Sequence, residues 1–305
     1  SHPLAGLPNL EERTPPEPLS PAAQEEASPL VGLLGEYLVC CVYSKSWNNR
    51  DAALQKLAMS LREGALPGSA AHEPPAAFSR LARALGIVFK RTVSDKNVQV
   101  FTSAAGVLQA FCHCGSQPPA RQQETKAVLE PLLPALAERL GESNARADST
   151  AREAHLHIAR MPGVGAAFAA QSLLRPPSKR TVPPRVYTSR LHLLGALVAE
   201  VGVQPENPHG LPLDPLMKLA MDWFSNPQAE VRESVVRLVA NCFARVGLGR
   251  IERYLANLRQ AQREVFDAEF DRVVAGTAQP MQHQVSSPMG SASSSGRRAM
   301  AGYGS

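Results

Sequence analysis

Aromatic and charged side chains are scarce in this sequence, at 5% and 19% of its 305 residues. Because 44% of the residues are apolar, the core must be built mainly from aliphatic and alanine side chains. Long apolar runs are also missing, and no segment reaches the roughly 20 apolar residues that span a bilayer. The first residues lack the basic start and apolar centre of a signal peptide. We therefore expect a soluble protein with no membrane partner.

Paired cysteine motifs and catalytic signatures are absent as well. The five cysteines form no CxxC pair, which excludes a zinc ribbon and argues against a disulfide framework. Most of them lie within apolar helical patterns, so we expect buried free thiols. The Cys112–Cys114 segment (Cys-His-Cys) is spaced too tightly for ordinary structural zinc, and the phosphate-binding and zinc-protease motifs are missing. The sequence thus predicts neither an enzyme nor a cofactor.

Charge is distributed unevenly along the chain. Residues 1–30 are rich in Pro, Glu, Ser and Ala and carry a net charge of −4, which predicts a mostly disordered leader. Residues 276–305 are of low complexity and are also expected to be disordered. The intervening region, 31–275, carries +7 and is the expected folded domain. A basic folded region favours an acidic partner.

The folded region shows helical periodicity that repeats along the chain. Short polar turns recur at Trp47, Asn97 and Asn144, at spacings of 50 and 47 residues. Asn226 follows 82 residues later, with Pro183–Arg185 midway. A period of about 40–47 residues with two helices per unit is typical of HEAT and armadillo repeats. We predict an all-α fold, an α-solenoid of about six HEAT-like helix pairs, in which residues 251–274 form a less regular sixth unit without a clear internal turn.

The first two turns carry a more specific resemblance. The segment Tyr43-Ser-Lys-Ser-Trp-Asn-Asn-Arg50 resembles the first turn of a TOG (tumour-overexpressed-gene) domain, and residues 93–100 resemble the second. This resemblance implies a flat paddle of six HEAT repeats that binds a tubulin heterodimer or a microtubule end through its turns. It also implies a location in the cytoskeleton of the cytoplasm, at the centriole and the cilium tip, because the similarity is greatest to the TOG domain of a ciliary-tip protein.

The resemblance places the candidate tubulin-binding residues on the turns. Trp47 has only polar neighbours, so we expect it to be exposed and to anchor the partner. Evenly spaced basic residues would meet acidic side chains. The turn asparagines either point amides at the partner or cap helices, and both alternatives stay open. The full candidate set is Lys45, Trp47, Arg50, Lys96, Asn97, Asn144, Arg146, Arg185 and Asn226.

Other conspicuous residues are expected to be structural. Trp223 lies on an apolar stripe and should be buried, while Arg152 and Arg232 should bond neighbouring carboxylates. The basic, proline-bounded run 175–185 is expected to be an extended loop, although it could also dock an acidic tail or be phosphorylated. The alternative function is a generic HEAT-repeat adaptor for an acidic peptide or nucleic acid. Nucleic acid is disfavoured because few aromatic residues are available to stack bases.

Overall fold

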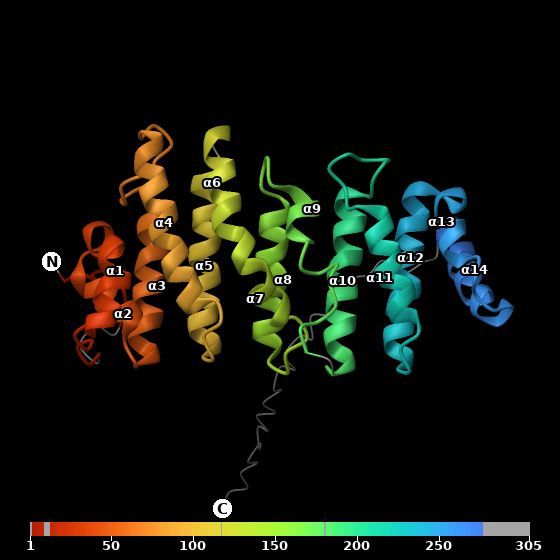
Figure 1. Cartoon of the computed structure of the whole chain (residues 1–305), viewed down its shortest axis with the longest axis horizontal. Helices are drawn as coiled ribbons and strands as arrows, with labels where there is room; N and C mark the ends of the chain where they lie inside the picture. Colours follow the sequence, from red (N-terminus) through yellow and green to blue (C-terminus); the bar gives the residue numbers. More distant parts are fainter. Residues whose placement is uncertain (1, 9–12, 117, 180, 277–305) are drawn as a thin grey trace, which may run out of the picture.

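The computed structural model describes residues 2–8, 13–116, 118–179 and 181–276, which form a row of helices (Figure 1). The helices are α1 (Pro21–Leu34), α2 (Glu36–Tyr43), α3 (Trp47–Arg62), α4 (Pro75–Thr92), α5 (Val98–Gly115), α6 (Pro119–Leu129), α7 (Leu133–Glu138), α8 (Ala145–Ala159), α9 (Gly165–Ala169), α10 (Pro184–Val201), α11 (Leu213–Phe224), α12 (Ala229–Val246), α13 (Leu248–Leu255) and α14 (Gln260–Val274). A 3₁₀ turn, Glu130–Leu132, joins α6 to α7.

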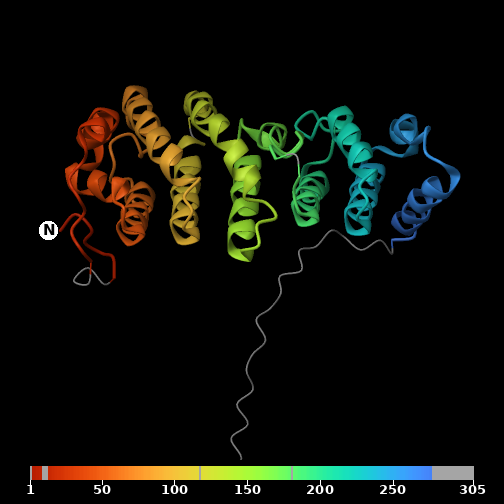
Figure 2. The same ribbon diagram turned by 60° about the horizontal axis from the view of Figure 1, so that its bottom comes forward.

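These helices alternate along the chain between two rows and make six successive two-helix units, which we call pairs (Figure 2). The first helices are α1–α2, α4, α6–α7, α9, α11 and α13, and the second helices are α3, α5, α8, α10, α12 and α14. Two of the first helices are interrupted, one at Gly35 and the other at the 3₁₀ turn. The predicted α-solenoid of HEAT-like pairs is therefore the observed architecture.

The second helices run parallel to one another. The Ser103 hydroxyl of α5 donates to Asp51 of α3 over 2.5 Å, both near the start of their helices. Near the end of α12, Asn241 donates to the Gly195 carbonyl of α10 over 3.3 Å. Because each second helix starts at the same edge, the turns within the six pairs gather along that edge.

The core is aliphatic, as the composition predicts, with two clusters of phenylalanines. One cluster stacks Phe78 on Phe111 at 5.8 Å between ring centroids. The other joins the fifth and sixth units, where Phe243 lies 4.4 Å from Phe270. The sixth pair has a defined internal turn at residues 256–259, so the expectation that this unit lacks one is wrong. None of the described helices is long and apolar enough to cross a bilayer.

The leader departs from the expectation of disorder. In its described residues, 2–8 and 13–30, Leu4 and Leu30 are buried in the core, and α1 starts at Pro21 with Ser20 as its N-cap. The Lys56 ammonium donates to the Ala5 carbonyl over 2.8 Å. Because the apolar content of this segment is low, its composition did not indicate that a few of its leucines pack against the first helix pair. The expected disordered tail lies outside the described residues beyond position 276.

A buried leader predicts a measurable contribution to stability. Leu4 is only 1% exposed, so we expect Leu4→Ala to lower the free energy of unfolding by about 2 to 3 kcal/mol. Leu248→Ala is the matched control, because Leu248 is 41% exposed and its loss should cost less than about 0.5 kcal/mol. Urea denaturation followed by circular dichroism measures both. Equal stability of the two variants would show that the leader is not docked in solution.

Candidate functional site

The turns within the helix pairs form a continuous surface, which we call the turn edge. It comprises residues 44–46, 93–97, 139–144, 181–183, 225–228 and 256–259. The N-termini of the six parallel second helices lie along it. Unpaired backbone N–H groups give each helix N-terminus a partial positive charge, so this edge favours negatively charged groups.

Trp47 is the exposed aromatic residue of the first turn. It is the first residue of α3 and is 44% exposed, which confirms the predicted exposure. Its neighbours Lys45 and Asn48 are exposed as well. The leader runs past this turn, where the Ser44 hydroxyl donates to Glu17 over 2.6 Å. That bond, with a contribution from the Lys45 charge, lowers the pKa of Glu17 and places a carboxylate beside the candidate contact.

Arg50 has a different role from the one expected. Its guanidinium forms a bidentate pair with Asp95 of the second turn, with Nε–Oδ2 and Nη2–Oδ1 distances of 2.8 and 3.1 Å. It also donates to the carbonyls of Ser44 and Lys45, each over 2.9 Å. The side chain is 19% exposed and fully engaged within the fold. Arg50 therefore joins the first turn to the second instead of presenting a free charge.

Two further arginines extend this connection along the turn edge. Arg139 of the third turn donates to the Asp95 carbonyl of the second, a bond that the sequence did not suggest. Arg185, at the start of α10, donates through Nε to the Gly141 carbonyl over 2.7 Å. We call Arg50, Arg139 and Arg185 the arginine ties. Together they set the positions of four successive turns relative to one another.

Three exposed basic candidates make no side-chain hydrogen bond to the described residues, whereas Arg185, although exposed, is engaged with the Gly141 carbonyl. Lys45, Lys96 and Arg146 are exposed. Among the described residues, the side chains of Lys96 and Arg146 make no hydrogen bond or ion pair, and Lys45 interacts through its charge with Glu17. Lys45 and Lys96 lie in the first and second turns, and Arg146 is the second residue of α8, just after the third turn. They lie on the same half of the paddle as Trp47.

The three turn asparagines each use the side-chain oxygen locally. Asn97 and Asn144 are N-caps, with their Oδ1 atoms accepting from the N–H groups of Gln99 (2.9 Å) and Arg146 (3.0 Å). The Oδ1 atom of Asn226 accepts from the Gln228 N–H over 3.0 Å. Capping, one of the two alternatives that the sequence left open, is therefore observed for Asn97 and Asn144, whereas Asn226 lies two residues before the N-cap of α12, Gln228. Each amide nitrogen remains available to donate to a partner.

The residues expected to be structural lie within the fold. Trp223 is buried, with its ring edge-on to that of Tyr187 at 4.9 Å. Arg152 bonds Asp148 over 2.7 Å, as predicted. Arg232, however, donates to the backbone carbonyls of Asn226 and Pro227 over 2.8 and 2.7 Å, so its expected carboxylate partner is wrong.

A buried polar cluster joins the third pair to the fourth. The Ser189 hydroxyl of α10 donates to Asp148 of α8 over 2.5 Å. Burial raises the pKa of Asp148, but the bonds from Ser189, the Gly141 N–H and Arg152 outweigh it and lower that pKa overall. Close by, His155 is completely buried, and its Nε2 atom has no hydrogen-bond partner in the described part of the chain.

The tie formed by Arg50 makes a prediction about stability. Arg50→Met should lower the free energy of unfolding by about 2 kcal/mol, because it removes several charge-assisted hydrogen bonds and leaves Asp95 without its cation. Lys96→Met removes an exposed cation from the adjacent turn and should change stability by less than about 0.5 kcal/mol. Thermal and urea unfolding compare the two. Similar values would mean that the Arg50 pair is not formed in solution.

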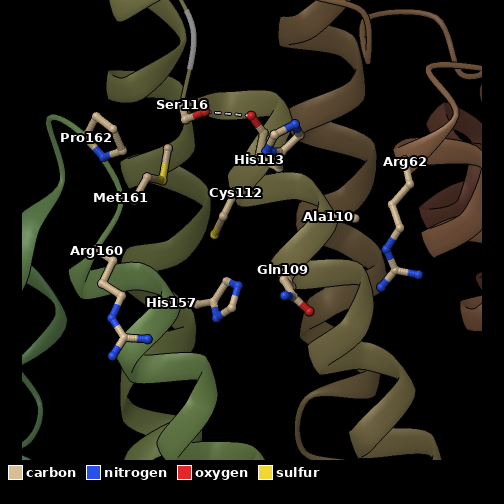
Figure 3. A pocket seen from close by; sticks show the side chains of 10 residues that line it. All are labelled: Arg62, Gln109, Ala110, Cys112, His113, Ser116, His157, Arg160, Met161 and Pro162. Atoms are coloured by element: carbon tan, nitrogen blue, oxygen red, sulfur yellow. Dashed lines mark hydrogen bonds between the residues drawn. The ribbon is translucent and has the colours of Figure 1, made fainter.

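A cavity of about 450 Å³ lies at the opposite edge (Figure 3). It is lined by Arg62, Gln109, Ala110, Cys112, His113, Ser116, His157, Arg160, Met161 and Pro162. Burial raises the pKa of Cys112 to about 12, so its thiol is protonated and poorly nucleophilic. Arg160 is held by Glu200 through bonds of 2.7 and 2.8 Å. The described residues include no cluster of metal-ligating side chains, and the turn edge remains the candidate site.

Comparison with known proteins identifies the architecture. Residues 24–238 match the family "Centrosomal protein CEP104, TOG domain". The curated relatives include the centrosomal protein of 104 kDa from Homo sapiens and from Rattus norvegicus, each 28% identical over 229 residues. The alignment covers 75% of this chain and 24% of each relative, so the chain spans about a quarter of their length.

Solved structures extend the similarity to the fold. The TOG domain of human Cep104 superposes with a TM-score of 0.67 at 25% identity, covering 87% of this chain and 99% of that domain. The third TOG domain of Drosophila melanogaster Mini spindles gives a TM-score of 0.58 at 15% identity, with coverages of 83% and 94%. The family match ends within α12, but the paddle continues through the sixth pair. The chain thus belongs to the CEP104 family of TOG domains.

Proposed function

We propose that this chain binds the tubulin heterodimer, or a microtubule end, through its turn edge. The observation that carries the proposal is the exposed Trp47 beside the accessible cations of the first three turns. Tubulin has an acidic surface, which complements both these cations and the helix N-termini behind them. The chain is similar in fold, at 18% identity and a TM-score of 0.59, to a structure from the microtubule polymerases that recruit tubulin with arrays of TOG domains.

The proposed roles follow from the contacts of each residue. Trp47 buries its ring against tubulin and supplies most of the affinity, since exposed aromatic anchors act as hot spots. Lys45, Lys96 and Arg146 steer the acidic partner and fix its register. The amide nitrogens of Asn97, Asn144 and Asn226 donate to the partner, while their oxygens accept backbone N–H groups of the chain. Arg50 and Arg185 contribute indirectly, by holding the turns in place.

On this proposal the chain is a binding domain without catalytic activity or a cofactor. It would act in the cytoskeleton of the cytoplasm, at microtubule ends. The relationship to centrosomal proteins supports a position at the centrosome, and we further propose the centriole and the cilium tip.

The function is tested by size-exclusion chromatography of the whole chain with unpolymerised tubulin at low and moderate salt. We expect co-elution that weakens as salt rises. The double variant Lys96→Glu/Arg146→Glu should weaken the complex by roughly tenfold, because both reversed charges face tubulin.

The control is Arg62→Glu/Arg80→Glu, an equal change of charge away from the turn edge at two exposed arginines. It should leave binding within about twofold, since screening limits its long-range effect. Failure of the folded wild-type chain to co-elute would overturn the proposal. Equal weakening by the two double variants would point instead to diffuse binding, as expected of an adaptor for an acidic peptide or nucleic acid.

A further inference from the structure

The connection between α9 and α10 carries an exposed serine in a basic setting. Ser178 lies in a non-helical stretch with bends at residues 175 and 178–179, in which Pro176 and Pro177 keep the residues before them out of the helical conformation. Arg175 stands three positions before the serine, is exposed, and makes no side-chain hydrogen bond or ion pair with any described residue. Protein kinases bind extended segments, and arginine-directed kinases hold this guanidinium against carboxylates.

The same stretch is attached to the buried junction between the third and fourth pairs. The Ser178 N–H donates to Oε1 of Glu138 over 3.2 Å. That oxygen also accepts from Nη2 of Arg190 over 3.1 Å. Through Nη1, Arg190 donates to the Arg175 carbonyl over 3.2 Å. Since Arg190 is only 1% exposed, the Glu138–Arg190 pair is a fixed point that holds the loop at both Arg175 and Ser178.

A phosphate on Ser178 would act on this attachment in two ways. It carries a charge of about −1.5 to −2 beside the Glu138 carboxylate, and repulsion between the two opposes the Ser178–Glu138 bond. It also adds negative charge next to the third turn, because Glu138 is the last residue of α7 and the third turn, which leads to Arg146 at the start of α8, follows directly. The first effect releases the loop, and the second reduces the positive potential of the turn edge.

We propose that Ser178 is a phosphorylation site for an arginine-directed protein kinase, and that its phosphate frees the loop and weakens binding of an acidic partner at the turn edge. In the reaction the Ser178 hydroxyl oxygen forms a bond to the γ-phosphorus of ATP. The bond from that phosphorus to the bridging oxygen breaks, ADP leaves, and the hydroxyl proton is released. The effect on tubulin rests on the proposed function, whereas the modification and the loop release do not.

The test incubates the whole chain with ATP and calmodulin-dependent protein kinase II, followed by mass spectrometry. Phosphate is expected on Ser178 and not on Thr181, which is also exposed but has no arginine three positions before it. Arg175→Ala should reduce incorporation at Ser178 at least tenfold. A synthetic peptide of residues 173–183 serves as the unfolded reference. Phosphorylation of the peptide but not of Ser178 in the folded chain would overturn the proposal.

Two measurements then follow the consequence of phosphorylation. Exchange of the Ser178 amide hydrogen should become at least tenfold faster, because that N–H loses its bond to Glu138, and Glu138→Gln, which removes the repelling charge, should largely abolish that acceleration. Tubulin affinity should fall roughly tenfold at 0.1 M salt, while Ser178→Ala treated with kinase keeps full affinity.

Unchanged exchange and unchanged affinity on phosphorylation would contradict the proposal. Absence of tubulin binding by the unmodified chain would instead refute the proposed function, and the exchange measurement would still decide the modification.

Discussion

Trp47→Glu should abolish co-elution of the chain with tubulin. The ring is 44% exposed in the free chain and, on the proposed function, becomes buried in the complex. Truncating such an anchor typically costs about 2 to 4 kcal/mol, and the new carboxylate adds repulsion toward an acidic surface. We therefore expect at least a hundredfold loss of affinity, measured by size-exclusion chromatography and by fluorescence titration.

Misfolding would not explain such a loss. Position 47 is the first residue of α3, where a glutamate interacts favourably with the helix N-terminus. Trp47→Phe should retain part of the affinity, since it keeps an aromatic ring without the indole. Leu248→Glu places the same charge at another exposed apolar residue, at the start of α13 away from the turn edge, and should bind as wild type. If Trp47→Glu still co-elutes, tubulin does not contact the first turn.

The buried His155 should make the paddle sensitive to acid. Burial, with a smaller contribution from the charge of Arg190, lowers the pKa of His155 to about 4. The ordinary value is 6.5, so the unfolded chain takes up a proton at a pH where the folded chain does not. The contribution of neutral His155 is therefore complete above about pH 6.5 and is lost as the pH falls toward 4. Between pH 7.5 and 4.5 the contribution of His155 to the free energy of unfolding should decrease by about 2 to 3 kcal/mol.

Urea denaturation at several pH values measures this dependence. His155→Gln should flatten it, because glutamine does not titrate, and His113→Gln serves as the control at an exposed histidine. The lowest pH is kept at 4.5 because the lowered pKa of Asp148 confines its own effect to pH values below its ordinary 3.8. An unchanged slope in His155→Gln would show that this ring is hydrated and not buried in solution.

Features with a local cause could be predicted from the sequence. The helix pairs follow from apolar periodicity, and the exposure of Trp47 follows from its polar neighbours, just as burial of Trp223 follows from the apolar stripe around it. The turns followed from polar residues at a regular spacing. In each case the cause lies within a few positions of the residue concerned.

Features that depend on distant partners could not be predicted. The pairing of Arg50 with Asp95 joins residues 45 positions apart, and nothing near Arg50 distinguishes it from the free Lys96. The burial of Leu4 could not be predicted for the same reason, because the side chains that cover it belong to helices that follow later in the chain. Composition gives only the average apolar content of a segment. It therefore did not indicate that a few apolar side chains of the leader are buried.

The arginine ties have a consequence for how the paddle can diversify. Arg139 and Arg185 bind main-chain carbonyls of the neighbouring turn. Arg50 binds the Asp95 carboxylate and, in addition, main-chain carbonyls of its own turn. A carbonyl is present whatever side chain its residue bears, so a substitution at an exposed position such as 96 leaves these bonds intact. Geometry and surface chemistry are thus specified by separate residues. New recognition properties can be acquired one turn at a time, on a frame whose spacing does not need to be rebuilt.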